Sequence, residues 1–211
     1  MGTHCGVIVT IENNEGLSPG EAALKRGFDL VVTIAVLGVG WYLIALAWLM
    51  ASLDTRSNGF FLQERIGRNG EPFKVIKLKT MRAAPGVTGK ARDLRITRVG
   101  AVLRNLKVDE LPQLLNVLLG HMSLVGPRPD LSGFADRLQG ADRLILSIRP
   151  GITGPATLKY RNEEALLAQQ SDPESYRRDV IWPDKVRINL DYIRNWRFTA
   201  DLRYLWRTLA G

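Results

Sequence analysis

LVVTIAVLGVGWYLIALAWLMASL, residues 30–53, is a run of 24 positions without a charged side chain. A helix of about 20 apolar residues is long enough to cross the hydrocarbon core of a bilayer. A cleaved signal peptide is a poor interpretation, because acidic residues precede the run and no small-residue cleavage site follows it. A buried core helix is the alternative, but the run exceeds the length of most soluble helices. The run therefore predicts a membrane-inserted helix.

The topology of this helix stays open between two arrangements. Lys25 and Arg26 precede the run and a basic region follows it, so cationic anchors flank both ends. Gly38 and Gly40 lie inside the run, and each lowers helix stability by about 1 kcal/mol. If the helix bends there, neither arm can cross, since nine residues rise only about 13 Å. We expect a re-entrant helix, with a spanning helix as the alternative.

The charge of the chain is unevenly distributed. The 211 residues carry a net charge of +8. Residues 1–29 hold two cations against four acids, a net charge of −2, so residues 54–211 carry the remaining +10. A positive excess beside an apolar helix is typical of the cytoplasmic side, where it faces anionic lipid. Nucleic-acid binding is not expected, because no basic stripe with interleaved aromatic residues accompanies the excess.

Cysteine and histidine are too scarce for two classes of site. The single cysteine, Cys5, excludes an intramolecular disulfide framework and a cysteine-rich zinc site. With two histidines, His4 and His121, a His-ligated transition-metal centre is not expected. A hydrophobic content of 45% and a charged content of 24% are those of an ordinary folded domain.

A β-hairpin is predicted after the apolar run. Phe60–Arg68 and Glu71–Met81 flank Asn69-Gly70, and Asn-Gly between two such runs is the strongest short hairpin signal. Alternation along the second strand places Lys77 on one face and its two neighbours on the other. The expected fold class is α+β: a membrane-inserted helix followed by a compact, helix-rich cytosolic domain with this small hairpin.

The clearest helix of the domain is predicted over Asp109–Leu119. Leucines recur there as one apolar stripe, Pro112 falls in the first turn, and Gly120 follows the end. Asp109 is the candidate N-cap. Consecutive side chains on a helix point about 100° apart, so Asp109 and Glu110 do not face each other. One carboxylate can therefore face a substrate phosphorus while the other faces a metal. The alternative is that the two carboxylates only stabilise a first turn.

Basic side chains and rigid turns surround the two carboxylates in the sequence. Arg104 lies upstream. Arg128 stands between two prolines, so its backbone is rigid and its guanidinium can be aimed at a phosphate. Pro150–Pro155 is a second rigid turn, near Arg161. The alternatives are a solvated arginine in a stiff connector and an ordinary loop.

A last helix is predicted near the C-terminus, with Thr199 as its cap. Its apolar side chains are Leu202, Leu205, Trp206 and Leu209. Arginines flank them, so this helix can lie on a membrane surface. Packing against the domain core is the equal alternative.

Three strings in the second half of the chain resemble one family. They are DELPQLLNV at 109–117, MSLVGPRP at 122–129 and PGITG at 150–154. They look like the bacterial sugar transferases, monotopic polyprenyl-phosphate phosphoglycosyl transferases that begin glycoconjugate assembly. The similarity also takes in KRGFDL at 25–30, KLKTM at 77–81, TRVG at 97–100 and the region of Asp201, so it covers nearly everything after residue 24.

The resemblance implies a specific reaction. Such enzymes transfer a sugar 1-phosphate from a UDP-sugar to polyprenyl (undecaprenyl) phosphate at the cytoplasmic face of the bacterial inner membrane, and release UMP. This is the first membrane step of polysaccharide biosynthesis. By similarity, Asp109 would be the nucleophile that forms an aspartyl-phosphosugar intermediate, and Glu110 would ligate Mg²⁺. The basic residues implied around the phosphates are Lys77, Arg104, Arg128 and Arg161.

The resemblance also implies a division of the chain, and the chain departs from the family in places. The division is an N-terminal extension (1–23), a membrane-inserted helix (24–54) and a catalytic domain (55–211). Many members have Ser-Pro at the bend of the membrane helix, where this chain has GVGW at 38–41. The alternative function is a non-catalytic basic scaffold at the membrane surface. A scaffold gives no reason for two carboxylates beside Pro-Arg-Pro, and an activity assay separates the two.

Overall fold

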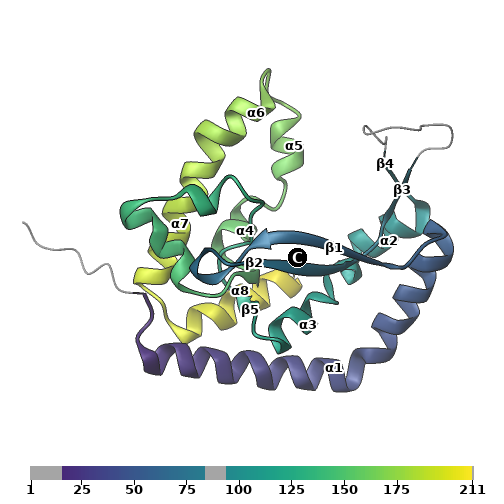
Figure 1. The fold of residues 1–211 in the computed structure, drawn as a ribbon, viewed down its shortest axis with the longest axis horizontal. Coiled ribbons are helices and arrows are strands. Elements are labelled where there is room, and N and C mark those ends of the chain that lie inside the picture. The colour runs from purple at the N-terminus through teal and green to yellow at the C-terminus, as the bar shows by residue number, and fades with distance from the viewer. Residues whose placement is uncertain (1–15, 84–93, 211) are drawn as a thin grey trace, which may run out of the picture.

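A long helix, α1 (Pro19–Thr55), forms one side of the molecule (Figure 1). The computed structural model describes residues 16–83 and 94–210. Ser18 and Glu21 form a capping box, in which each side chain accepts the other residue's backbone N–H. The helix thus begins at Pro19, ahead of residue 24. The division at 1–23, 24–54 and 55–211 stays a prediction, and residues 1–15 lie outside the described residues.

The described residues contain further helices and three strand pairs. The other helices are α2 (Arg98–Asn105), α3 (Gln113–Leu118), α4 (Pro155–Lys159), α5 (Glu163–Leu167), α6 (Pro173–Tyr176), α7 (Trp182–Arg194) and α8 (Phe198–Ala210). The antiparallel pairs are β1 (Phe60–Ile66) with β2 (Pro72–Leu78) and β3 (Met81–Ala83) with β4 (Leu94–Ile96). The parallel pair is β5 (Ser123–Val125) with β6 (Gly151–Thr153).

α1 packs against the rest of the molecule at two places. Phe28, Val32 and Leu37 in its first half contact the main hydrophobic core. Ala47 and Ala51 in its second half belong to a smaller core shared with β2 and α2. Figure 1 shows the helix change direction between these two contacts. The stretch between them contains the two glycines predicted to mark a bend, and glycine is a weak helix former.

The outer face of α1 is apolar and exposed. Its most apolar 18-residue window has a mean hydropathy of 2.4, and 11% of that window is buried. By length and composition the helix can enter a membrane, whereas a core helix of a soluble domain would hide most of this surface. The exposed side chains include Val31, Ile34, Val39, Trp41, Tyr42, Leu46 and Leu53.

Buried polar contacts hold the first half of α1 on the domain. Lys25 donates to Asp201 on α8 at 2.6 Å, and both side chains are almost fully buried. Asp201 also accepts from Tyr192 at 2.6 Å and from Trp196 at 3.1 Å. One turn along α1, Asp29 accepts a backbone N–H of β5 at 3.1 Å. Because these charges are shielded from water, removing one partner would leave another charge buried and unpaired.

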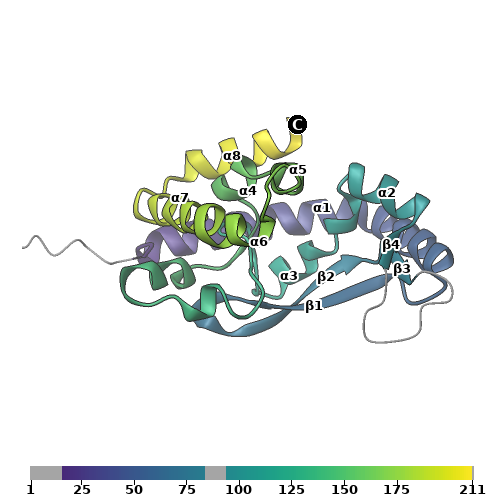
Figure 2. The same ribbon diagram turned by 90° about the horizontal axis from the view of Figure 1, so that it is seen from above.

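The predicted hairpin is confirmed as β1 and β2. Asn69 and Gly70 at its tip have φ angles of 61° and 86°, left-handed values that asparagine and glycine tolerate. Figure 2 shows the hairpin along one side of the molecule and α8 along the opposite side. With the long apolar N-terminal helix and this small hairpin, the predicted α+β class is also confirmed.

The register of the hairpin decides which side chains face the interior. Residues directly opposite each other in an antiparallel pair lie on the same face. Arg65 pairs with Phe73, and Gln63 pairs with Val75. Phe73 and Val75 are buried in the main core. The same inner face therefore carries Gln63 and Arg65 from β1 and, by alternation, Lys77 from β2.

The prediction of a helix over Asp109–Leu119 is wrong in its first turn. α3 begins only after Pro112, and Asp109 with Glu110 lies in a separate 3₁₀ turn before it. Pro112 has no N–H, so it interrupts the i to i−4 hydrogen-bond ladder of an α-helix. Hydrogen bonds between i and i+3 close the turn instead. Asp109 therefore does not cap α3.

The last predicted helix is confirmed as α8, although its start differs. It begins at Phe198, so Thr199 lies inside its first turn and does not precede it. Leu205 packs against the main core. Trp206 and Leu209 are exposed on another face of α8. One face of α8 thus packs on the core, as one of the two alternatives predicted. The exposed apolar face is the one that the membrane-surface alternative would use, and that alternative stays a prediction.

Candidate active site

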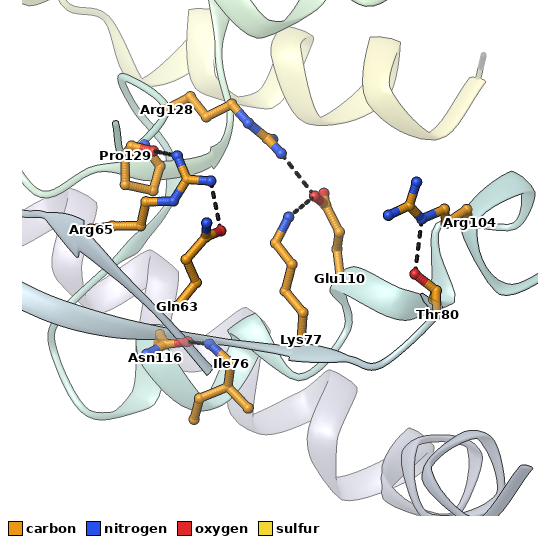
Figure 3. Close-up of polar contacts among 10 residues, drawn as sticks. All are labelled: Gln63, Arg65, Ile76, Lys77, Thr80, Arg104, Glu110, Asn116, Arg128 and Pro129. Carbon is orange, nitrogen blue, oxygen red and sulfur yellow. Dashed lines mark hydrogen bonds and ion pairs between the residues drawn. The ribbon is translucent and has the colours of Figure 1, made fainter. Parts of the chain in front are cut away.

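Glu110 stands at the centre of a cluster of charged side chains (Figure 3). Its Oε1 atom accepts from Lys77 Nζ at 2.7 Å and from Arg128 Nη2 at 3.0 Å. Burial alone would raise the pKa of Glu110, but Arg128 and Lys77 outweigh it and lower the pKa to about 2. Glu110 is therefore an anion at neutral pH. Its Oε2 atom has no hydrogen bond to the described residues, since both contacts use Oε1.

Lys77 points toward Glu110 because β2 is fastened to α3 beside it. The side-chain amide of Asn116 on α3 accepts from the Ile76 N–H at 2.9 Å and donates to the Lys74 carbonyl at 2.7 Å. Asn116 is 1% exposed, so these bonds are shielded from water. They attach β2 to α3 immediately before Lys77, and this attachment sets the direction of the lysine side chain.

Asp109 is the second carboxylate of the cluster and is partly buried. Burial raises the pKa of Asp109, and so does the negative charge of Glu110; Lys77 and Arg104 act in the opposite direction. Unlike Glu110, Asp109 forms no ion pair with the described residues. It is therefore a carboxylate near cations but not neutralised by direct contact with one, which leaves its oxygens available to a ligand.

Arg104 is placed by the contact between α2 and the end of β2. Its Nε atom donates to the Thr80 hydroxyl at 2.9 Å, and Thr80 is buried. α2 approaches closely here, since a Cβ on Gly100 would lie 2.2 Å from the Thr80 carbonyl oxygen. Because the contact uses Nε, the two terminal nitrogens of Arg104 are left for a ligand.

Arg128 is aimed by two rigid turns that pack together. The Gly126 N–H donates to the Thr153 carbonyl at 2.8 Å, and the Gly151 N–H donates to the Pro127 carbonyl at 2.8 Å. A Cβ on Gly151 would lie 2.1 Å from the Gly126 nitrogen, so this approach requires glycine. The two turns that the sequence analysis treated separately therefore form one unit, which directs Arg128 toward Glu110.

Arg161 is the predicted site residue that the structure does not join to this cluster. Its guanidinium donates to the carbonyl of Arg207, near the C-terminus of α8, at 3.0 Å. No contact among the described residues links it to Glu110, and its role stays a prediction. The other five predicted residues lie together: Asp109, Glu110, Lys77, Arg104 and Arg128.

The sequence analysis missed Gln63 and Arg65, which also lie at this site (Figure 3). Arg65 donates from Nη2 to the Gln63 Oε1 atom at 2.7 Å and from Nη1 to the Pro129 carbonyl at 3.3 Å. Two polar residues at alternate positions of a predicted strand share one face. That spacing, beside Lys77 on the partner strand, is the signal that could have found them.

Comparison with known proteins identifies the family. Residues 20–211 match the family described as bacterial sugar transferase. The chain belongs to this family. The matched residues take in both α1 and the site, and this sugar transferase is an enzyme.

Several relatives resemble this sugar transferase over most of its length. An uncharacterized sugar transferase of Bacillus subtilis (strain 168) is 35% identical over 188 residues, covering 88% of this chain and 85% of the relative. An exopolysaccharide production protein of Rhizobium meliloti (strain 1021) is 31% identical over 219 residues, covering 95% and 90%. The UDP-glucose:undecaprenyl-phosphate glucose-1-phosphate transferase of Caulobacter vibrioides is 36% identical over 194 residues, covering 89% and 68%.

The site of this sugar transferase offers a carboxylate, Glu110, that fits a metal whose other ligands include substrate phosphates. Among the described residues, no three Asp, Glu, His or Cys side chains gather as a metal site. Mg²⁺ keeps several of its waters, and one or two carboxylates together with substrate phosphates usually complete its coordination. Glu110 is ionised, and its Oε2 atom accepts no hydrogen bond from residues 16–83 and 94–210, so it is a donor of that kind.

Proposed function

We propose that this sugar transferase moves a sugar 1-phosphate from a UDP-sugar to undecaprenyl phosphate, releasing UMP and forming an undecaprenyl-diphosphate sugar. The observation that carries the proposal is the cluster around Glu110, in which Lys77 and Arg128 converge beside Asp109. Relatives named as undecaprenyl-phosphate sugar phosphotransferases support this acceptor. The product places the reaction at the start of exopolysaccharide assembly.

The first step uses Asp109 as the nucleophile. A carboxylate oxygen of Asp109 attacks the sugar-bound phosphorus of the donor. The bond from that phosphorus to the bridging oxygen breaks, and UMP leaves with the bonding electron pair. An acyl phosphate links Asp109 to the sugar phosphate. No proton is transferred, because the nucleophile is already an anion and UMP leaves as one.

The second step returns the enzyme to its starting state. A phosphate oxygen of undecaprenyl phosphate attacks the same phosphorus, and the bond from phosphorus to Asp109 breaks. The carboxylate recovers its electron pair, and the new bond completes the lipid diphosphate. Two displacements at one phosphorus let one site use the donor and the acceptor in turn. The configuration at the sugar is retained because the bond from the anomeric carbon to oxygen never breaks.

The surrounding cations supply the electrostatic part of the mechanism. Lys77 and Arg104 both favour the ionised form of Asp109, which the nucleophile requires. The same cations, with Arg128, oppose the negative charge of the diphosphate and of the leaving group. Glu110 holds Lys77 and Arg128 together and prevents them from neutralising Asp109 by direct contact.

Mg²⁺ is part of this proposal, and Glu110 would be the side chain that holds it. When bound, Mg²⁺ neutralises charge on the phosphate oxygens and so makes the phosphorus easier to attack. Glu110 suits this role because its pKa of about 2 keeps it ionised at any physiological pH.

The membrane arrangement follows from α1. Its first half is tied to α8 by the Lys25–Asp201 ion pair, and its second half packs on α2 and β2. A helix held to one domain at both ends, with a bend between, suits a re-entrant insertion from one side of the membrane. We therefore propose that the exposed apolar face of α1 enters the inner leaflet and that the domain lies on the cytoplasmic face, where UDP-sugars are found.

UMP release tests the proposed function directly. Purified protein is incubated with Mg²⁺, undecaprenyl phosphate and each member of a panel of UDP-sugars. At least one sugar is expected to support UMP release that depends on the lipid. Folded protein that releases no UMP with any sugar would contradict the proposal and favour the scaffold.

Two variants link the activity to the site. Asp109→Asn and Glu110→Gln are each expected to abolish turnover while the protein stays with the membrane. Arg137→Gln, an exposed substitution outside the cluster, is the matched control and is expected to keep full activity. Near-normal turnover by Asp109→Asn would exclude the covalent route.

A further inference from the structure

Arg65 is a guanidinium held firmly in place by neutral groups. Its two terminal nitrogens donate to the Gln63 amide oxygen and to the Pro129 carbonyl. Burial lowers the pKa of Arg65, and the nearby Arg128 lowers it further, while Asp130 opposes them. The two guanidiniums repel each other, so this corner of the site favours an anion that contacts both.

Asp130 offsets only part of the positive charge of this corner. Burial raises the pKa of Asp130 to about 6. Its carboxylate interacts electrostatically with three cations, Lys185, Arg65 and Arg128. Lys185 is itself paired with Glu163 at 2.6 Å, and Arg128 with Glu110 at 3.0 Å. Arg65 forms no ion pair with any described residue, so the positive charge of its guanidinium has no direct counter-ion.

The cations of the site are arranged in a row. Figure 3 shows Arg65 on one side of Glu110 and Arg104 on the other, with Lys77 between. Arg104 belongs to α2, which packs on the second half of α1 through the smaller core. Arg65 lies at the end of the row that is farther from this part of α1.

A donor diphosphate spans part of this row. Its sugar-bound phosphorus must lie at Asp109, whose electrostatic partners are Lys77 and Arg104. The second phosphate then extends either toward Arg104 or toward Arg128 and Arg65. The Arg128 end carries two guanidiniums and the Arg104 end carries one, so the Arg128 end is the stronger site for the second phosphate.

On the basis of the proposed function, we propose that Arg65, positioned by Gln63, forms with Arg128 the subsite for the nucleotide-side phosphate of the donor. When the bond from the sugar-bound phosphorus to the bridging oxygen breaks, the electron pair stays on UMP, and these two guanidiniums face the new charge. A planar guanidinium suits a phosphate because it donates two parallel hydrogen bonds.

Comparing inhibition by UMP with inhibition by uridine, which lacks the phosphate, isolates the contribution of the phosphate contact. In wild type, UMP is expected to inhibit more strongly than uridine. In Arg65→Met, which keeps the aliphatic stem, the inhibition constant for UMP is expected to rise about tenfold or more while that for uridine is unchanged. The KM for the UDP-sugar is expected to rise with it. Arg68→Met, an exposed substitution on the same hairpin, is the control.

Two further variants keep the test decisive if Arg65→Met folds poorly. Arg65→Lys retains the charge without the planar fork and is expected to weaken UMP inhibition by a smaller factor. Gln63→Leu removes the positioning contact, and its effect on UMP is expected to be non-additive with that of Arg65→Met. Unchanged UMP inhibition in folded Arg65 variants would overturn the subsite, as would a rise in KM confined to undecaprenyl phosphate.

The failure of this subsite and the failure of the proposed function are distinguishable. If wild type releases UMP with a UDP-sugar but Arg65→Met responds to UMP as wild type does, the proposed function stands and the subsite is wrong. If wild type releases no UMP and UMP binding does not depend on Arg65, both are wrong.

Discussion

Glu110 illustrates how single side chains set the electrostatics of the site. Lys77 and Arg128 lower its pKa from 4.5 to about 2. A depressed carboxyl pKa stabilises the folded state above pH 4.5, and this stabilisation is lost as the pH falls toward 2. The difference corresponds to roughly 3 kcal/mol at neutral pH.

Glu110→Gln is therefore expected to lower the Tm of the ligand-free protein in detergent by several degrees at pH 7. The gap between variant and wild type should narrow as the pH is lowered from about 5 toward 3, since protonation removes the same charge in wild type. Thermal unfolding followed at each pH measures this. Glu164→Gln, at an exposed position, is the control. A difference in Tm between wild type and Glu110→Gln that stays constant with pH would contradict the lowered pKa of Glu110.

Residues of the site differed in how far they could be predicted. Glu110 and Arg128 stand in recognisable sequence strings, so the residue types and their order were sufficient to predict that both belong to the site. Arg65 was missed because its place depends on strand register and on a carbonyl 64 residues away, at Pro129. A contact of that range depends on the packing of two elements, which the local sequence does not specify.

At the scale of elements, the hairpin and α3 act as a pair joined by Asn116. Its amide satisfies one donor and one acceptor on β2, at Ile76 and Lys74. The leucine stripe of α3 was readable from sequence, as was the Asn-Gly tip of the hairpin. The start of α3 could not be predicted from the sequence. The leucine periodicity continues through Pro112, whereas the helical hydrogen-bond ladder is interrupted there.

Asn116→Leu, of similar volume, tests this joint. It leaves two partly buried backbone groups without their side-chain partner and is expected to cost roughly 1–3 kcal/mol of stability. Because Lys77 follows Ile76 directly, kcat should also fall more than KM rises. Unfolding and steady-state kinetics measure the two effects, with Asn162→Leu at an exposed position as the control. Wild-type stability and kcat in Asn116→Leu would show that the joint has no such role.

At the scale of the whole molecule, α1 is both a membrane element and part of the domain. The uncharged run predicted an apolar helix, and its outer face is exposed. The inner face was the unpredicted part. Lys25, Asp29 and Thr33 recur every four residues and are all buried. That spacing marks one helix face, but only the tertiary structure supplies the partner, Asp201.

The proposed re-entrant arrangement has a direct topological consequence. In a Cys5→Ser background, single cysteines are placed at two exposed positions: Gly20, in the first turn of α1, and Glu71, after its end. Both are expected to react with a membrane-impermeant maleimide in inverted inner-membrane vesicles and neither in intact spheroplasts. Labelling of the two cysteines from opposite sides would establish a spanning helix. A cysteine at Val39, near the bend, is expected to be shielded from the reagent in both preparations.

The most direct test of the central claim is intact-protein mass spectrometry after brief mixing with a reactive UDP-sugar in the absence of lipid. The account predicts a mass increase equal to one sugar phosphate, located by fragmentation on Asp109 and removed when undecaprenyl phosphate is added. A protein that turns over UDP-sugar and lipid together, yet never carries that mass, would contradict it.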